Sequence, residues 1–277
     1  MLSTKTKDLN SLARQFAIQY QKAKPFPNIS FDDFFDDDFL TNVLEEFPDL
    51  SKKDSITFND SKQIKLAGKG ESNFGEHTKK LMHFLNSEPF LHFLQILTGI
   101  TEPLISDPYF FGGGQHEIKK GGLLKVHADF NKHPQLKLDR RINVLVYLNK
   151  DWKPEYGGNF ELWDKNMEKC ETKILPIFNR MAIFSTTDFS YHGHPDALNC
   201  PEDRSRKSLA LYYYSNGRPA SEINAHQEKH NTLFKERKNN LEDTAAFKLS
   251  AKEKLKSFVK DCIPPIISKK RHKSTDF

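Results

Sequence analysis

Residues 123–131 read LLKVHADFN, and residues 141–149 read RINVLVYLN. Both are short, mainly apolar runs of the kind that form buried β-strands, whose side chains alternate between two faces. In the first run, His127 and Asp129 therefore point to one face together with Lys125. An imidazole and a carboxylate side by side in a barrel interior are costly unless something pairs them. The run predicts a strand that carries a polar site.

Further runs of this kind follow Pro103, and Gly, Pro, Asn and Asp separate them. They read ISDPYFF, GGNFELWD, ETKILPIFNRMAIFST and RKSLALYYYSNG. Six or more strands at this spacing are typical of an antiparallel sandwich or barrel. The fold class is therefore predicted to be mainly β with flanking α-helices.

The rest of the chain predicts helices on either side of this β core. Apolar spacing from Leu9 to Tyr20 indicates a helix, a short strand is expected over 29–31, and acidic residues 36–38 are placed to cap another helix. A polar loop is expected over 51–75, a helix over 77–97, and charged helix after Pro219. The predicted units are an N-terminal helix (1–25), a β domain with supporting helices (26–219) and a charged helical extension (220–277).

Composition favours a globular cytoplasmic protein. The 277 residues are 37% hydrophobic and 29% charged, with 23 Phe available for a core. No apolar run approaches the roughly 18 residues of a membrane span, and the N-terminus lacks the apolar segment of a secretory signal. The three cysteines, Cys170, Cys200 and Cys262, form no CxxC pair. A reducing compartment and no membrane partner are expected.

The net charge of +5 lies in the tail. Residues 220–277 hold 13 Lys/Arg and 8 Asp/Glu, whereas residues 1–219 hold 29 of each. A neutral body argues against a nucleic-acid partner, and the tail is interpreted as a solvated helix. HQEKH (226–230) is interpreted as a solvated helix face, and KKRHK (269–273) as a disordered end.

A divalent metal would pair His127 with Asp129. Two histidines and one carboxylate form the facial triad of non-heme Fe(II) oxygenases. The second histidine is sought after IFNRMAIFST, where HGHP offers His192 and His194. His192 is favoured, with His194 as the alternative. The second His-x-Asp of the chain, which ends at Asp196, lies in a Pro-containing loop and is read as loop chemistry.

An arginine at the start of an apolar strand suggests a carboxylate site. Arg206 opens RKSLALYYY, and its planar fork suits bidentate binding of a carboxylate. Ser208 shares its face of the strand as a possible second donor. Arg204 is a competitor, because the loop between His192 and this strand is long.

These motifs resemble those of the 2-oxoglutarate- and Fe(II)-dependent dioxygenase superfamily, in its prolyl 4-hydroxylase-like branch. The resemblance rests on HxD, a distal His and an Arg on the following strand, and on RRINVLVYLNKDW followed by GG at 157–158. It covers roughly residues 105–217, and PFPNISFDDFF resembles the branch's entry strand. The implied fold is a double-stranded β-helix, a jelly-roll and cupin relative.

The resemblance implies an Fe(II)- and 2-oxoglutarate-dependent hydroxylase. The metal ligands and catalytic centre would be His127, Asp129 and His192. The 2-oxoglutarate would be bound by Arg206, Tyr147 and Ser208. O₂ is the other cosubstrate, ascorbate a possible reductant, and succinate and CO₂ the coproducts. The substrate expected from the resemblance is a prolyl residue or a proline-like molecule.

Four matters stay open at this level. The alternative functions are a hydroxylase of a free amino acid or small metabolite, and a non-catalytic β-barrel binding protein. Lys125 and Arg141 lie near the predicted site, and either is a candidate partner for a carboxylate of the substrate or of 2-oxoglutarate. Gln115 and His116 are further candidates for substrate contact. The sequence sets no oligomeric state.

Overall fold

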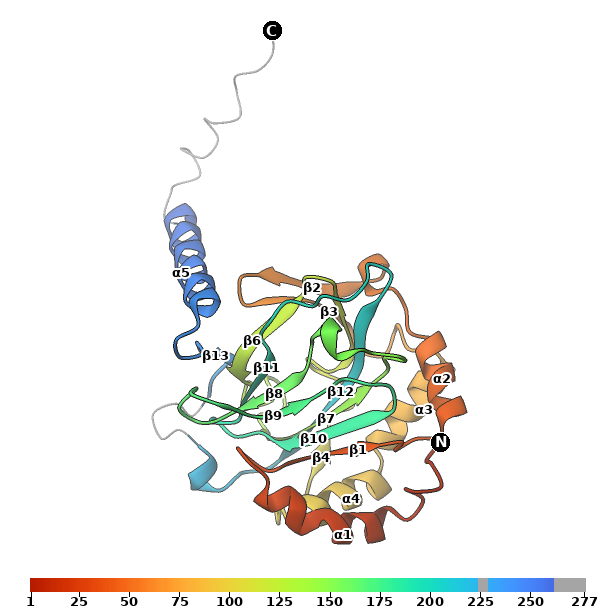
Figure 1. The fold of residues 1–277 in the computed structure, drawn as a ribbon. Coiled ribbons are helices and arrows are strands. Elements are labelled where there is room, and N and C mark those ends of the chain that lie inside the picture. The colour runs from red at the N-terminus through yellow and green to blue at the C-terminus, as the bar shows by residue number, and fades with distance from the viewer. Residues whose placement is uncertain (224–228, 262–277) are drawn as a thin grey trace.

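The computed structural model describes residues 1–223 and 229–261, and its core is one antiparallel sheet that curls around an interior (Figure 1). The strand order is β1-β10-β7-β12-β5-β3-β6-β11-β8-β9, with β2 on β3, β4 on β12 and β13 on β6. In chain order the strands are β1 (Asn28–Asp32), β2 (Ser55–Asp60), β3 (Gln63–Gly68), β4 (Ile105–Ser106), β5 (Gly114–Lys119), β6 (Leu123–Ala128), β7 (Asp139–Tyr147), β8 (Phe160–Trp163), β9 (Cys170–Ile174), β10 (Arg180–Ser185), β11 (Tyr191–His194), β12 (Ser205–Ser215) and β13 (Leu233–Phe234).

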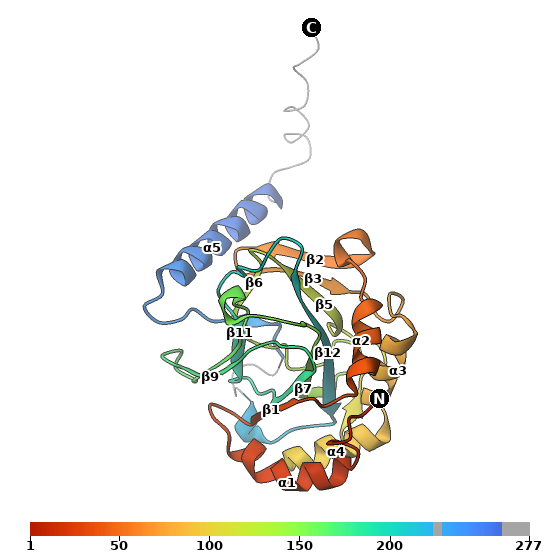
Figure 2. The ribbon, with the colours of Figure 1, turned by 45° about the vertical axis from the view of Figure 1, so that its right-hand side comes forward.

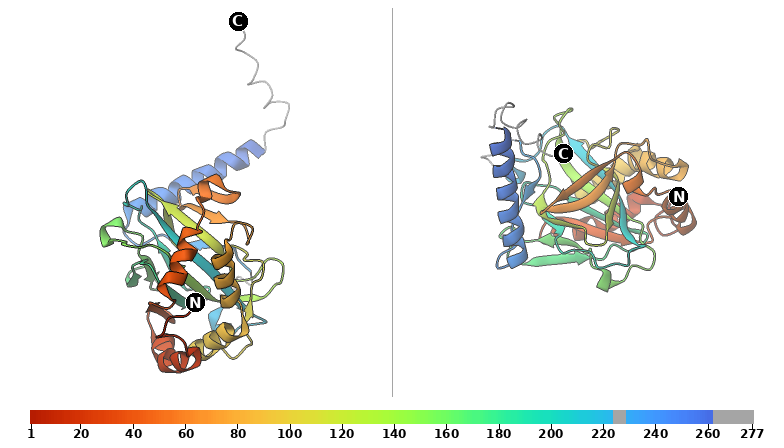
Figure 3. Two further views of the ribbon diagram at one scale, coloured as in Figure 1. Left: turned by 90° about the vertical axis from the view of Figure 1, so that its right-hand side faces the viewer. Right: turned by 90° about the horizontal axis from the view of Figure 1, so that it is seen from above.

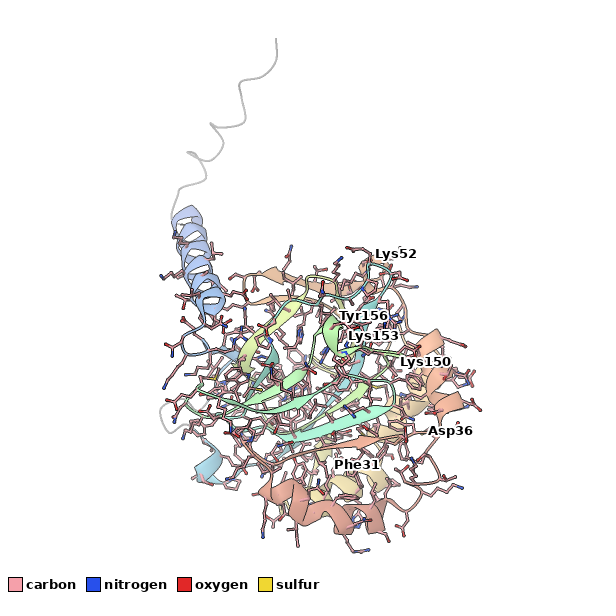
Figure 4. All side chains as sticks on the ribbon, in the orientation of Figure 1. Phe31, Asp36, Lys52, Lys150, Lys153 and Tyr156 are labelled. Carbon is pink, nitrogen blue, oxygen red and sulfur yellow. The ribbon has the colours of Figure 1, made fainter. Side chains whose placement is uncertain are left out.

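Four helices cover one face of this sheet: α1 (Leu9–Lys22), α2 (Asp37–Glu45), α3 (Glu76–Leu85) and α4 (Glu88–Thr98). In Figures 1 and 2, α1 and α4 lie side by side beneath β1 and β10. Figure 4 shows Phe31 of β1 above these helices, and its ring lies 5.3 Å from that of Phe16 on α1. The N-terminal helix therefore shares its core with the sheet.

Alternation along β7 separates this helix-covered core from the barrel interior. Ile142, Val144 and Val146 are fully buried in the core beneath the helices. Asn143 and Leu145, which lie between them, line a cavity inside the barrel. One strand thus anchors the helices on one face and presents its other face to the interior.

Glu46, the residue after α2, caps the start of α3. The N-cap of α3 is Gly75, which has no side chain to offer, and the Glu46 carboxylate accepts the backbone N–H groups of His77 and Thr78 at 3.0 Å. A Cβ on Gly75 would lie 2.4 Å from that carboxylate. Burial raises the pKa of Glu46, but these hydrogen bonds outweigh burial and lower it to about 2.

The stability supplied by Glu46 is expected to depend on pH. Its pKa is lower in the folded chain than the ordinary value of 4.5, so the stabilisation is present above pH 4.5 and is lost as the pH falls towards 2. We expect Glu46→Gln to lower the free energy of unfolding by about 1–3 kcal/mol at neutral pH and by less in acid. Urea unfolding at several pH values measures this, with the exposed Glu45→Gln as control. A Glu46→Gln deficit that stays constant into acid would contradict it.

The structure corrects three local predictions. The polar loop expected over 51–75 contains the hairpin β2–β3, whose residues pair from Ser55↔Gly68 to Asp60↔Gln63. The single helix expected over 77–97 is two helices, because the chain breaks at Asn86 and Ser87 before Pro89 at the start of α4. The other two helices and β1 agree with prediction.

The third correction concerns the extension, which is not simply a solvated helix. Strand β13 pairs with β6, and Phe234 lies opposite His127. The helix α5 (Leu241–Asp261) follows; it begins beside the barrel, and its far end projects beyond it (Figures 1 and 3). Of HQEKH, only Lys229 and His230 are described; His230 is buried outside any helix and contacts Asp188 at 2.9 Å. KKRHK at 269–273 lies outside the described residues.

No helix within residues 1–223 and 229–261 is both long enough and apolar enough to cross a membrane.

Candidate active site

His127, Asp129 and His192 meet inside the barrel. His127 on β6 lies directly opposite His192 on β11, and Asp129 follows the end of β6. The Nε2 atom of His127 is 3.6 Å from one Asp129 oxygen, and Nε2 of His192 is 3.4 Å from the other. One ligand atom from each residue lies within 4.8 Å of the other two. The three donors face a common point, as a facial metal site requires.

Backbone carbonyls fix the tautomer of both histidines. The Nδ1 atom of His127 lies 2.9 Å from the carbonyl of Lys125, and Nδ1 of His192 lies 2.9 Å from that of Ser190. Each Nδ1–H therefore donates to a carbonyl, which leaves the lone pair of Nε2 free for a metal. Burial lowers the pKa of His192 to about 4, so this ligand is neutral at physiological pH.

Asn143 and Arg140 hold the carboxylate of Asp129. The Asn143 amide donates to it at 2.7 Å, and the Arg140 guanidinium lies 3.0 Å away. Burial opposes ionisation of Asp129, but the positive charge of Arg140 counteracts burial, and the pKa of this carboxyl lies well below its usual range. Arg140 is itself packed over the ring of Tyr212 at 3.4 Å. The ligand carboxylate is thus ionised and fixed in orientation.

A β-bulge in β6 sends Lys125 away from the site. His192 pairs with His127 but His194 pairs with Leu124, so β6 contains one extra residue opposite Gly193. The extra residue reverses the alternation. Leu124 and His127 line the interior cavities, whereas Lys125 bonds to Asp243 at 2.8 Å. The prediction that Lys125 shares the face of His127 is therefore wrong.

Arg206 occupies the far end of the interior. It is buried on β12, its Nε donates to the carbonyl of Gly158 at 2.9 Å, and it lies 3.4 Å from the Tyr147 hydroxyl. Gly158 has a positive φ of 72°, and a Cβ there would approach the Arg206 side chain to 3.0 Å. Arg204 instead donates to the carbonyl of Lys150 in the β7–β8 connection at the surface (Figure 4).

Two adjoining cavities contain these groups. The inner one, about 80 Å³, lies between the three candidate metal ligands and Arg206, and Ser208 and His194 line it. The outer one, about 410 Å³, opens over His127 and Asp129 and is bounded by the β2–β3 hairpin and the loop 109–112. Lys65 and His116 line both cavities. The inner cavity is thus the smaller of the two and lies deeper in the barrel, and the outer one is a cleft.

The structure therefore brings together the six residues predicted for the site: His127, Asp129, His192, Arg206, Tyr147 and Ser208. Arg141 lies elsewhere, on Glu102 and Ser215. Asp196, from the second His-x-Asp, pairs with Arg237 at the surface.

Sequence reasoning missed several residues that contact or line the site: Arg140, Asn143, Lys65 and, as a cavity residue, His194. His194 is buried, and neither ring nitrogen has a hydrogen-bond partner among the described residues. Asn143 could have been predicted from the sequence, because it is a polar residue within an apolar strand and lies two residues from Arg141. The others sit in sequence contexts that look like surface.

The fold and the triad define a class: a double-stranded β-helix with a two-histidine, one-carboxylate metal site. Residues 114–214 match the family model of the 2OG-Fe(II) oxygenase superfamily. The chain is thus similar to this superfamily over the strands from β5 to β12. The family implies Fe(II), 2-oxoglutarate and O₂, and the donor set of His127, Asp129 and His192 fits the metal.

Three known proteins illustrate the likeness. A prolyl 3,4-dihydroxylase of Ostreococcus tauri is 26% identical over 230 residues, which are 76% of this chain and 41% of that protein. The chain thus spans less than half the length of this relative. A Trichoplax adhaerens prolyl hydroxylase, solved with a hypoxia inducible factor peptide, superimposes with a TM-score of 0.56 at 17% identity, covering 77% of this chain and 94% of that one. A Pseudomonas putida prolyl-4-hydroxylase gives 0.53 at 13%, covering 74% and 100%. The two structures share the fold.

Proposed function

We propose that this protein is an Fe(II)- and 2-oxoglutarate-dependent hydroxylase that acts on a prolyl residue, with succinate and CO₂ as coproducts. The observation that carries the proposal is the convergence of His127, Asp129 and His192 at one end of the inner cavity, with Arg206 at the other. Names of the relatives above support a prolyl substrate.

The metal would be held by His127, Asp129 and His192. Bound iron together with 2-oxoglutarate supplies the oxidising power that hydroxylation of an unactivated C–H bond needs. The protein supplies the orientation of the ligands, through the carbonyls of Lys125 and Ser190 and through Asn143 and Arg140. It also supplies a water-poor interior, since both histidines are buried.

The distal carboxylate of 2-oxoglutarate would be bound by Arg206. Arg206 has no acidic partner among the described residues, and burial lowers its pKa, so an anion in the inner cavity compensates a buried charge. The Tyr147 hydroxyl and Ser208 are the neutral donors on the same wall. We add His194 to this set, because its unpaired ring nitrogens line the same cavity.

The outer cavity suits a peptide. Its rim exposes large apolar side chains, with Tyr109 61% and Phe111 43% exposed. The buried Asp107 carboxylate accepts the backbone N–H groups of both residues, at 2.9 and 2.7 Å, and so holds the rim in place. Preformed aromatic surface beside a metal site offers contact to a proline ring and its neighbours. A small free metabolite would contact less of this apolar rim than a peptide would.

The test is cosubstrate binding under anaerobic conditions. We expect the wild-type protein with Fe(II) to bind 2-oxoglutarate and to release succinate when O₂ and a proline-containing peptide are added. Arg206→Met is expected to weaken 2-oxoglutarate binding by about 10- to 150-fold, because a charge-assisted hydrogen bond contributes about 1.5–3 kcal/mol. Calorimetry measures the affinity, and Arg204→Met is the matched control. Equal affinities for wild type and Arg206→Met would reject this role.

A cytoplasmic location is proposed on the cysteine chemistry. Cys170 and Cys200 are free thiols in the described part of the chain, as expected in a reducing compartment.

A further inference from the structure

Lys65 is a cation in the cleft that the proposed mechanism does not use. It lies on β3 of the β2–β3 hairpin, which crosses the top of the barrel in Figure 2. Among the described residues, it is the one charged residue besides Asp129 that lines both the inner and the outer cavity. Its side chain therefore stands where the cosubstrate cavity opens into the substrate cleft.

No carboxylate neutralises Lys65 in the described chain. Its Nζ lies 4.9 Å from the centre of the Phe58 ring, opposite it on the hairpin, and no hydrogen bond or ion pair to it is found among the described residues. Other cations of the cleft are paired, Lys69 with Asp54 and Arg140 with Asp129. Lys65 thus differs from its neighbours in having only a ring beside it.

The surroundings of Lys65 favour the binding of a negatively charged ligand. Burial lowers the pKa of Lys65 to about 8; Asp129 opposes this shift, and Arg140 and Arg206 add to it. An anion at the Nζ would reverse the penalty. Within the described residues that line the two cavities, the only acidic side chain is Asp129, which is committed to the metal and Arg140.

The cosubstrate leaves this excess charge in place. Fe(II) and 2-oxoglutarate carry opposite charges of equal size, so their binding together does not alter the sum. The single charge of Asp129 then faces those of Arg140, Arg206 and Lys65. A neutral substrate leaves two positive charges in a partly dry cleft, whereas an anionic one is complementary.

We propose that Lys65 binds a carboxylate of the substrate, so that the enzyme selects a target residue flanked by aspartate or glutamate. The proposal rests on the proposed hydroxylase function and names the substrate class of the same site. It also predicts discrimination, because a lysine or arginine beside the target would face Lys65 and Arg140.

The experiment compares two labelled peptides that differ only in glutamate or glutamine next to a central proline. Binding is followed by fluorescence anisotropy in the presence of 2-oxoglutarate and Mn(II), which replaces iron so that no turnover is needed. We expect the glutamate peptide to bind wild type about 10- to 100-fold more tightly, as for a charge-assisted hydrogen bond. Lys65→Met should abolish the difference and Lys65→Arg should retain most of it.

Two controls make the outcome specific. Lys52→Met removes one positive charge at the exposed edge of the molecule (Figure 4), where the side chain is 80% exposed, and it should leave the peptide ratio unchanged. The affinity of Lys65→Met for 2-oxoglutarate shows whether the inner cavity of the variant is folded. It also shows whether Lys65 binds a carboxylate of 2-oxoglutarate instead of one of the substrate. If Lys65→Met loses 2-oxoglutarate affinity but keeps the peptide ratio, the cosubstrate is the partner of Lys65 and the proposal is overturned.

The remaining outcomes separate the two proposals. Equal binding of the two peptides to wild type, or no binding of either, overturns the role of Lys65. A clear glutamate preference without any hydroxyproline or succinate formed with Fe(II) and O₂ supports the role of Lys65 and counts against the hydroxylase function. Turnover of both peptides with one kcat/KM supports the hydroxylase function and overturns the acidic selectivity.

Discussion

Asp129→Ala should abolish hydroxylation and lower the affinity for Fe(II) by more than about 100-fold. Losing a residue that only hydrogen-bonds to a metal ligand costs about 10- to 100-fold in affinity, and the loss of a ligand itself should cost more. The variant removes one of three protein ligands and the only carboxylate of the group. It also leaves Arg140, which is almost fully buried, without its ion pair. Titration with Fe(II) under anaerobic conditions measures the affinity apart from activity, and circular dichroism checks that the variant is folded.

The chain contains a matched control for this experiment. Asp196 stands in the second His-x-Asp sequence, two residues after His194, but its side chain is 65% exposed and pairs with Arg237 at the surface. Surface ion pairs contribute about 0–1 kcal/mol, so Asp196→Ala should bind Fe(II) and turn over like wild type. Equal losses in Asp129→Ala and Asp196→Ala would mean that the triad is not the metal site.

Arg140→Met should lower the affinity for Fe(II) by less than Asp129→Ala does. Arg140 does not reach the metal position but holds the Asp129 carboxylate at 3.0 Å, so the expected loss of Fe(II) affinity is the outer-shell 10- to 100-fold. The loss of Fe(II) affinity should therefore decrease in the order Asp129→Ala, Arg140→Met, Asp196→Ala. These residues are a proposed ligand, a partner of that ligand and a surface carboxylate.

The site was predictable where a motif fixes both residue type and strand face. His127 and Asp129, then His192, then Arg206 and Ser208 occur in an order that the resemblance interprets, and the barrel brings them together. His192 rather than His194 belongs to the triad, because it lies opposite His127 while His194 lies opposite Leu124. The sequence left this choice open, since both histidines share one face of β11.

The misses have physical causes. The hairpin β2–β3 is half-exposed and polar, so its residues lack the apolar alternation that marks a strand. Lys125 points outward because of a bulge that depends on the register between β6 and β11, and no local pattern encodes it. Strand β13 has two residues, too few for any periodicity. The missed Lys65 follows from the missed hairpin.

Asp243→Ala should destabilise the folded chain by about 3–5 kcal/mol, the usual cost of breaking a buried ion pair by removing one partner. Asp243 is fully buried, and its carboxylate accepts Lys125 Nζ at 2.8 Å and two guanidinium nitrogens of Arg237 at 2.9 Å. Burial opposes its ionisation, but the Arg237 and Lys125 hydrogen bonds prevail and lower its pKa. The variant removes the acceptor of the buried Lys125 and leaves Arg237 with only the exposed Asp196 carboxylate. Urea unfolding measures the change, and the exposed Glu242→Ala should be near neutral.

The ion pair between Lys125 and Asp243 connects the C-terminal segment to β6, the strand that carries His127. Lys125 lies two residues before His127 on β6, and β13 pairs with the same strand at His127 and Ala128, so that Phe234 packs 5.5 Å from the His127 ring. A weakened ion pair should therefore loosen His127 as well as the fold. We expect Asp243→Ala to lower Fe(II) affinity at temperatures where the protein remains folded, while Glu242→Ala does not. Full Fe(II) affinity in a destabilised Asp243→Ala would show that β13 supports the fold without positioning the ligand.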